Sequence, residues 1–236
     1  MHLYNTVILA AGSNSFLLPH GVEESKMAFI VAGEKLIEKI TNTYLSGDTY
    51  LAVSDETVKV KEERIKIVSV GKTKGALITA LIAIRDCDLN LPVFFTPGDA
   101  LISKEKFEEF RLQSINSDQD VSLIVFDSEN PKYSYVRMLE EKLVEVCEKK
   151  VISSKATAGI FYFKSANLFI EYAEWAIMNS IQTKGLFYLA PALNYAVVKG
   201  FNPILFQINE ADYFRFSTLE EAIISEKRYR HANPQN

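Results

Sequence analysis

The sequence predicts an α/β protein built around a mixed β-sheet. Through the first half, short β-rich runs alternate with helical patterns, which is typical of a sheet with helices packed on it. The second half is richer in strand patterns and contains a predicted hairpin. With 48% hydrophobic and 24% charged residues, the chain has the composition of a globular protein and the length to bury a substantial core.

The first half contains four runs that are rich in apolar and β-branched residues. They predict strands over 6–11, 49–53, 66–70 and 91–97. Apolar residues at helical spacing predict helices over 34–45, 74–85 and 103–115. Ser103 is a favoured residue type for the N-cap of the last of these helices. The strand over 91–97 stops abruptly at Pro97-Gly98-Asp99.

The second half begins with strand patterns and ends with helical ones. Strands are predicted over 121–126, 158–163 and 203–208, with a hairpin over 133–139 and 142–147. Helices are predicted over 165–179, 191–199 and 219–228. Because no repeat, low-complexity tract or Pro/Ser-rich linker divides the chain, we predict a single domain over residues 1–236.

Charge and composition exclude several classes of partner. The net charge of −4 argues against a dedicated nucleic-acid binder, which normally has a clustered basic excess. Two cysteines cannot make a disulfide framework, so we expect a reducing, cytoplasmic setting. The N-terminal apolar run lacks a cationic lead, and nothing approaches the ~20 apolar residues of a membrane span. The apolar segment 161–181 is a candidate interface for a homo-oligomer.

Three loops follow or precede predicted strands where ligands collect in open α/β sheets. They contain Ala10-Ala11-Gly12, the stretch GKTKGA over 71–76, and TPGDAL over 96–101. Glycine lets the backbone approach a ligand and turn its N–H groups toward a phosphate, although small residues here also serve tight turns and close packing. Asp99, at the exposed end of an apolar strand, is suited to holding Mg²⁺ or to capping the next turn.

The order and spacing of these motifs carry more information than any one of them. VILAAG is followed by Lys26, fourteen residues beyond Gly12, then by an apolar run with Gly33, by TKGA, and by GD after an apolar strand. This series resembles the sugar-1-phosphate nucleotidylyltransferase family. The likeness continues in KYSYVRM (132–138), VCEKKVISSKATAGIFYF (146–163) and GLFYLAPALN (185–194). It covers about residues 6–221 and is strongest to a nucleotidyltransferase-like branch found among capsule and lipopolysaccharide genes.

The resemblance implies a Rossmann-like nucleotide-diphospho-sugar transferase fold, three-layered, with a mixed and mostly parallel central sheet. Residues 1–120 would form a nucleotide-binding half and 121–236 an acceptor-binding half. The implied activity is Mg²⁺-dependent transfer from a nucleoside triphosphate to a phosphorylated sugar or similar acceptor, with release of pyrophosphate, in surface-polysaccharide precursor synthesis. One alternative is a non-catalytic nucleotide- or sugar-binding relative, or a regulatory partner. A glycosyltransferase ranks last, because Asp99 is followed by Ala100-Leu101 and forms no D-x-D metal motif.

The resemblance also assigns roles to residues. Lys26 would sit by the α-phosphate and Asp99 would bind Mg²⁺, so that these two are the predicted catalytic residues. The predicted nucleotide-binding residues are Ala10, Ala11, Gly12, Thr73, Gly75 and Ala76. The predicted acceptor-binding residues are Glu148, Lys149, Gly159 and Tyr188, the first two for the acceptor's hydroxyl and phosphate.

The chain departs from the family pattern where phosphate is handled. In the first loop, Asn14 replaces the second glycine and Phe16 replaces an arginine, which removes a forked phosphate donor. If the loop kept the family path, Phe16→Arg would raise triphosphate affinity. The segment 213–218 falls where the family has its second metal aspartate, and Arg215 stands near that place. Candidates for replacement positive charge are Lys72, Lys74, His20 and Arg215.

Overall fold

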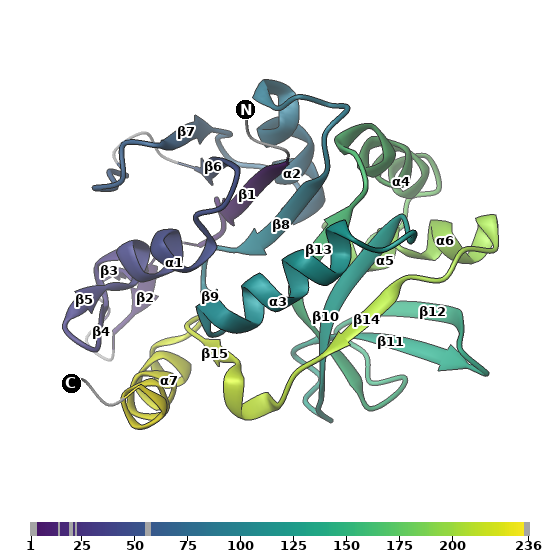
Figure 1. Cartoon of the computed structure of the whole chain (residues 1–236). Coiled ribbons are helices and arrows are strands. Elements are labelled where there is room, and N and C mark those ends of the chain that lie inside the picture. Colours follow the sequence, from purple (N-terminus) through teal and green to yellow (C-terminus); the bar gives the residue numbers. More distant parts are fainter. Residues whose placement is uncertain (1–3, 14, 19–20, 22, 55–57, 234–236) are drawn as a thin grey trace.

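The computed structural model describes residues 4–13, 15–18, 21, 23–54 and 58–233 (Figure 1). In chain order, its strands are β1 (Asn5–Ala10), β2 (Ser15–Leu17), β3 (Glu23–Ser25), β4 (Ile30–Val31), β5 (Glu34–Lys35), β6 (Asp48–Val53), β7 (Ile65–Ser69), β8 (Val93–Pro97), β9 (Ala100–Leu101), β10 (Val121–Asp127), β11 (Ser134–Leu139), β12 (Lys142–Glu148), β13 (Lys155–Phe163), β14 (Ile204–Gln207) and β15 (Phe214–Arg215). Its α-helices are α1 (Leu36–Tyr44), α2 (Ala76–Ala83), α3 (Lys104–Ile115), α4 (Ala166–Met178), α5 (Leu189–Ala192), α6 (Asn194–Lys199) and α7 (Leu219–Ala232). Short 3₁₀ helices are η1 (Lys26–Ala28), η2 (Ile84–Asp86) and η3 (Glu210–Asp212).

One mixed sheet runs through both halves of the described chain. Its order is β12-β11-β13-β8-β1-β6-β7, and β10 and β14 join it through β13. Strands β7, β6, β1 and β8 are parallel to one another, as is β14 to β10. Strand β13 pairs antiparallel with β8 and thereby joins the second half to the first.

The apolar strands are buried on both faces of the sheet, because successive side chains point to opposite sides. Val7 belongs to one hydrophobic cluster and Ile8 to the other, and Phe95 and Phe94 divide in the same way. Helices α1, α3 and α7 pack in the cluster of Ile8, and α2, α4, α5 and α6 in the cluster of Val7. The predicted α/β fold class with a layered mixed sheet is therefore confirmed (Figure 1).

The predicted strands and helices are all present, and their ends differ for local reasons. The helix predicted from residue 74 begins at Ala76, because Gly75 has a φ of 109° that no helix continues. The helix predicted over 191–199 is split into α5 and α6. At the start of α6, the side chain of Asn194 hydrogen-bonds both backbone groups of Val146 on β12. Ser103 caps α3 by accepting a hydrogen bond from the backbone N–H of Lys106, as predicted.

Two further expectations concern the surface. Among the described residues, no helix is long and apolar enough to cross a membrane. In the segment 161–181, which was a candidate interface, the aromatic side chains of Phe161, Phe163, Phe169 and Tyr172 are buried within the fold. Its exposed apolar side chains are Ile177 and Met178. The apolar character of this segment is thus explained mainly by the core.

Gly98, the residue directly after β8, packs tightly on the end of β1 at the edge where the predicted site residues lie. A Cβ built on Gly98 would lie 2.6 Å from the Cα of Ala10 and 2.7 Å from the carbonyl oxygen of Leu9. Both are backbone atoms of a buried strand, so neither can move cheaply. We expect Gly98→Ala to lower the free energy of unfolding by ~1–3 kcal/mol, measured by urea denaturation.

Gly12 supplies the matched control, because a Cβ there would meet nothing within 4 Å. Gly12→Ala should therefore leave the free energy of unfolding within ~1 kcal/mol of the natural chain. Equal stability of the two variants would contradict the close packing of Gly98 on Ala10.

Candidate active site

Two adjoining pockets open at the carboxyl ends of the parallel strands. The first has a volume of about 630 Å³ and is lined by the ends of β1 and β8 and by the start of α2. The second, of about 240 Å³, lies over β11, β12 and β13. Leu9, Ala76 and Asp99 line both pockets. A ligand group bound beside Asp99 would therefore reach both of them.

The first pocket gathers residues predicted to bind the nucleotide and to catalyse transfer. They are Ala10, Ala11, Gly12, Lys26, Thr73, Gly75, Ala76 and Asp99. The Thr73 hydroxyl is fixed, since it lies 2.7 Å from the Thr79 hydroxyl and donates to the carbonyl oxygen of Gly75. Backbone at the end of β1 and a polar loop before α2 thus face the same cavity.

The start of α2 is held against the segment that links the two pockets. The backbone N–H of Leu77 donates to the carbonyl oxygen of Phe187, and that of Phe187 donates to the carbonyl oxygen of Lys74. A Cβ on Gly75 would lie 2.3 Å from the carbonyl oxygen of Phe187, so this contact needs a glycine. One residue before Phe187, Leu186 lines the first pocket, and one residue after it, Tyr188 lines the second.

The C-terminal part of the chain returns to Asp99. Strand β15 pairs with β9, which begins directly after Asp99, and the backbone N–H of Phe216 donates to the carbonyl oxygen of Asp99 (Figure 1). The hydroxyl of Ser217 donates to Oδ2 of Asp99 at 2.7 Å and accepts from Nε of Arg215 at 2.9 Å. Arg215 and Ser217 therefore lie beside Asp99, and the alignment of residues 213–218 with the family's second metal segment stays a prediction.

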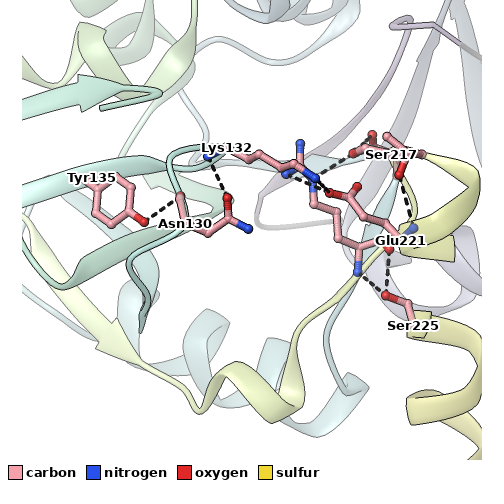
Figure 2. A network of polar contacts seen from close by, with 9 residues as sticks. Asn130, Lys132, Tyr135, Ser217, Glu221 and Ser225 are labelled. Carbon is pink, nitrogen blue, oxygen red and sulfur yellow. Dashed lines mark hydrogen bonds and ion pairs between the residues drawn. The ribbon is translucent and has the colours of Figure 1, made fainter. Parts of the chain in front are cut away.

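Arg215 is held on several sides. Its backbone N–H and carbonyl both hydrogen-bond the hydroxyl of Ser225 on α7. Its guanidinium lies over the ring of Tyr133, 5.3 Å from the centroid, and Nη1 is 3.8 Å from Oε1 of Glu221. Figure 2 shows Ser217, Glu221 and Ser225 gathered at this place, with Lys132 reaching Glu221 from the loop before β11.

The second pocket gathers residues predicted to bind the acceptor. Glu148, Gly159 and Tyr188 line it. The Ser134 hydroxyl donates to the Glu148 carboxylate, and burial raises the pKa of Glu148 above its usual value. Gly159 has a φ of 75°, and its open Cβ position meets only Pro97 at 4.0 Å, which leaves room above β13. Hydroxyl recognition by Glu148 is consistent with this geometry.

Lys149 lies beside the second pocket and not on its wall. Its Nζ donates to the Tyr188 hydroxyl at 3.0 Å, lies 4.8 Å from the centroid of that ring, and is 3.8 Å from Oε1 of Glu148. The ammonium is therefore already engaged by groups of the protein. Its predicted role toward an acceptor phosphate stays a prediction.

Lys26 is the buried cation of the first pocket, with 6% of its surface exposed. Its Nζ lies 5.5 Å from the centroid of the Phe16 ring. Burial lowers the pKa of Lys26, and the negative charge of Asp99 opposes that shift. An ammonium kept in a partly desolvated pocket beside a carboxylate is well placed to offset phosphate charge.

The side chain of Phe16 is buried, whereas a gain in triphosphate affinity from Phe16→Arg would need this position to face the first pocket. Phe16 is 2% exposed, packs edge-to-face on Phe29 with ring centroids 5.7 Å apart, and lies on β2, which pairs with β3. A side chain buried there belongs to the core and faces no phosphate. Substitution by arginine is therefore not expected to raise triphosphate affinity.

The candidates for replacement positive charge separate in the structure. Lys72 lines the first pocket and Arg215 the second, whereas Lys74 is exposed and lines neither. His20 and Asn14 lie outside the described residues.

Ser217, Ser134 and Tyr133 are site residues to which the sequence analysis assigned no role. Only their places in the quoted segments 132–138 and 213–218 gave a signal.

The donor set around Asp99 does not fit Mg²⁺ well. Asp99 is the only carboxylate on the described wall of the first pocket, and its Oδ2 already accepts from Ser217. Lys26 and Arg215 both lie close enough to interact electrostatically with Asp99. Within the described ranges, no group of three His, Cys, Asp or Glu side chains could hold a metal ion. A divalent cation would meet two cations, Lys26 and Arg215, and two carboxylates, Asp99 and Glu221, that already accept hydrogen bonds from protein groups.

No protein-family profile matches the chain. It is 26% identical over 217 residues to the bifunctional protein GlmU of Thermodesulfovibrio yellowstonii, a match that covers 84% of this chain and 46% of that protein. The chain thus spans about half the length of this curated relative.

Three solved structures share the fold. A nucleoside-diphosphate-sugar pyrophosphorylase of Vibrio cholerae superposes with a TM-score of 0.78 at 17% identity, covering 94% of this chain and 99% of its own. An inositol-1-phosphate CTP transferase of T. maritima gives 0.71 at 14% identity, with 98% and 97% covered. A Bacillus anthracis protein solved in complex with sucrose gives 0.70 at 16% identity, with 99% and 97% covered.

The fold is that of the Rossmann-like nucleotidyltransferases that these structures represent. Together with the sequence match, it supports the resemblance to the sugar-1-phosphate nucleotidylyltransferase family that the motifs indicated.

Phe16→Arg should destabilise the protein, because it places a guanidinium in a buried aromatic cluster. We expect a loss of about 3 kcal/mol or more in the free energy of unfolding, measured by urea denaturation. Phe16→Leu is the control for lost aromatic packing and should cost less. Equal stabilities of the arginine and leucine variants would show that the position tolerates charge.

Lys26→Met should stabilise the folded chain at pH 7, because burial disfavours the Lys26 ammonium. We expect a gain of ~0.5–2 kcal/mol, typical of replacing a strained site residue. With a lowered pKa, the folded chain releases this proton before the unfolded chain does. The Lys26 contribution to stability should therefore rise with pH up to about 10.5, the usual lysine value.

Urea denaturation between neutral and alkaline pH measures this difference. Lys104→Met, at an exposed position on α3, is the matched control and should follow the natural chain at every pH. A Lys26→Met variant that is no more stable at pH 7 than this control would contradict the desolvation of Lys26.

Proposed function

We propose that this chain is a nucleotidyltransferase that joins a nucleoside triphosphate to a phosphorylated sugar or similar acceptor. The observation that carries the proposal is the place of Asp99, on the shared wall of two pockets. Lys26 and the small residues at the end of β1 line one pocket, and Glu148 and Gly159 line the other. Two substrates bound there would meet next to Asp99.

The transfer step needs positioning and charge compensation more than acid–base chemistry. A phosphate oxygen of the acceptor attacks the α-phosphorus, a new P–O bond forms, and the bond to the bridging oxygen of the β-phosphate breaks. The electron pair of that bond leaves with pyrophosphate, and no proton has to move. Lys26 would stabilise the charge that develops on the α-phosphate.

The second pocket supports a polyhydroxylated acceptor. Glu148 is a buried hydrogen-bond acceptor at its wall, and Gly159 leaves space over β13. The product would be an activated sugar or alcohol of the kind that polysaccharide assembly consumes, in agreement with the likeness to capsule and lipopolysaccharide branches. The resemblance predicts Mg²⁺ at Asp99, although the donor set there does not favour it. Transfer is therefore tested with and without Mg²⁺.

A non-catalytic relative that binds a nucleotide or a sugar phosphate is the second candidate. Two observations favour it: Phe16 is buried where the family has a phosphate-binding arginine, and Arg215 stands near the place of a metal ligand. Such a protein would bind its ligands in the same pockets and would transfer no nucleotidyl group. A glycosyltransferase remains last, because Leu101, two residues after Asp99, is fully buried in β9.

Release of pyrophosphate tests transfer directly. The assay crosses the common nucleoside triphosphates with a panel of phosphorylated sugars and alcohols, with and without Mg²⁺. One productive pair should release pyrophosphate, and Lys26→Met should lower kcat/KM on that pair by about a hundredfold or more. Lys104→Met is the control and should leave it unchanged. No release by the folded chain across the panel would favour the binding relative.

A further inference from the structure

The junction of the two pockets carries a fixed cation of the protein. Arg215 is clamped through its backbone by Ser225 and through its Nε by Ser217, which in turn donates to Asp99. Its guanidinium therefore keeps one position relative to Asp99 without any added ion. Arg215 also lines the second pocket, together with Lys132.

One nitrogen of the guanidinium is buried without a hydrogen-bond partner, as is Oε2 of the neighbouring Glu221. Nη1 makes no hydrogen bond within the described part of the chain, and its 3.8 Å separation from Oε1 of Glu221 is too long for one. Because a buried donor without an acceptor costs stability, this group needs an explanation. A planar guanidinium with free N–H groups matches the oxygens of a phosphate.

The local charges leave no excess of carboxylates for a cation. Lys26 interacts electrostatically with Asp99, Arg215 and Glu221, and Glu148 interacts with Arg215. Lys132 donates to Glu221 at 3.0 Å. Three positive and three negative groups therefore meet at this place. A second metal cation would find these carboxylates already compensated, whereas a phosphate would meet Lys26 and Arg215.

We propose that Arg215 takes the place of a divalent cation at the junction of the two pockets and binds a phosphate group of the ligand, so that phosphate binding needs no Mg²⁺. This inference rests on the proposed function only for the choice of phosphate compounds as ligands. Lys26 then faces the same phosphate from the first pocket. Asp99 acts as a positioning residue that holds Arg215 through Ser217.

Binding of inorganic pyrophosphate, measured by isothermal titration calorimetry in EDTA, tests the phosphate role. The natural chain should bind it, and Arg215→Gln should weaken binding about tenfold to a hundredfold through loss of a charged donor. Arg64→Gln is the matched control, because Arg64 is exposed, lines neither pocket and pairs with the nearby Glu62. Binding that appears only when Mg²⁺ is added, or no binding in either buffer, overturns the proposal.

Binding of Mn²⁺ alone, followed by the free-ion signal in electron paramagnetic resonance, tests the metal role. The natural chain should leave Mn²⁺ free, whereas Arg215→Asp, which pairs a second carboxylate with Asp99, should bind it. Mn²⁺ binding by the natural chain that Asp99→Asn removes would overturn the proposal. Circular dichroism checks that each variant is folded, and Arg215→Gln provides a reading if Arg215→Asp does not fold.

These outcomes separate the inference from the proposed function. A chain that binds pyrophosphate in EDTA through Arg215 and yet releases none from any substrate pair would keep the inference and lose the transferase. A chain that transfers only with Mg²⁺, and whose pyrophosphate binding ignores Arg215→Gln, would keep the transferase and lose the inference.

Discussion

Strand β8 is the element on which the rest of the structure depends. It pairs parallel with β1 and antiparallel with β13, so it joins the two halves of the sheet. Gly98 at its end packs on the backbone of Ala10, which brings the loop after β8 close to the loop after β1. Asp99 follows directly after Gly98, at the boundary between the two halves, and for this reason it faces both pockets.

The C-terminal segment also contacts this boundary between the two halves of the sheet. The β9–β15 pairing and the bond from the Phe216 N–H to the Asp99 carbonyl bring Arg215 and Ser217 to a site that begins more than a hundred residues earlier in the chain. Two residues that depart from the expected pattern differ in what they bring to the site. Phe16, in the first loop, is a buried aromatic ring, and Arg215, in the C-terminal segment, is a cation beside Asp99. Positive charge near Asp99 therefore comes from Lys26 and Arg215, and Phe16 adds none.

Much of the fold was predictable from local patterns. Continuous apolar runs such as that of β8 need burial on both faces, and such burial requires helices on both sides of a sheet. The strand ends and the small residues after them located the first pocket, because ligands in such sheets gather there. The short ladders β2–β3, β4–β5 and β9–β15 were not predictable, since two or three residues carry no periodicity and their pairing is decided by the partner.

The sequence by itself determined the layered sheet, the order of its main elements and the candidate residues around Lys26, Asp99 and Glu148, because hydrophobic periodicity and motif spacing are local properties of the chain. Tertiary structure alone decided that Phe16 is a core residue and that Lys149 is engaged by Tyr188. It also decided that Arg215 is tied to Asp99 through Ser217. Burial and charge pairing between distant segments depend on how the chain returns on itself, and no local pattern records that path.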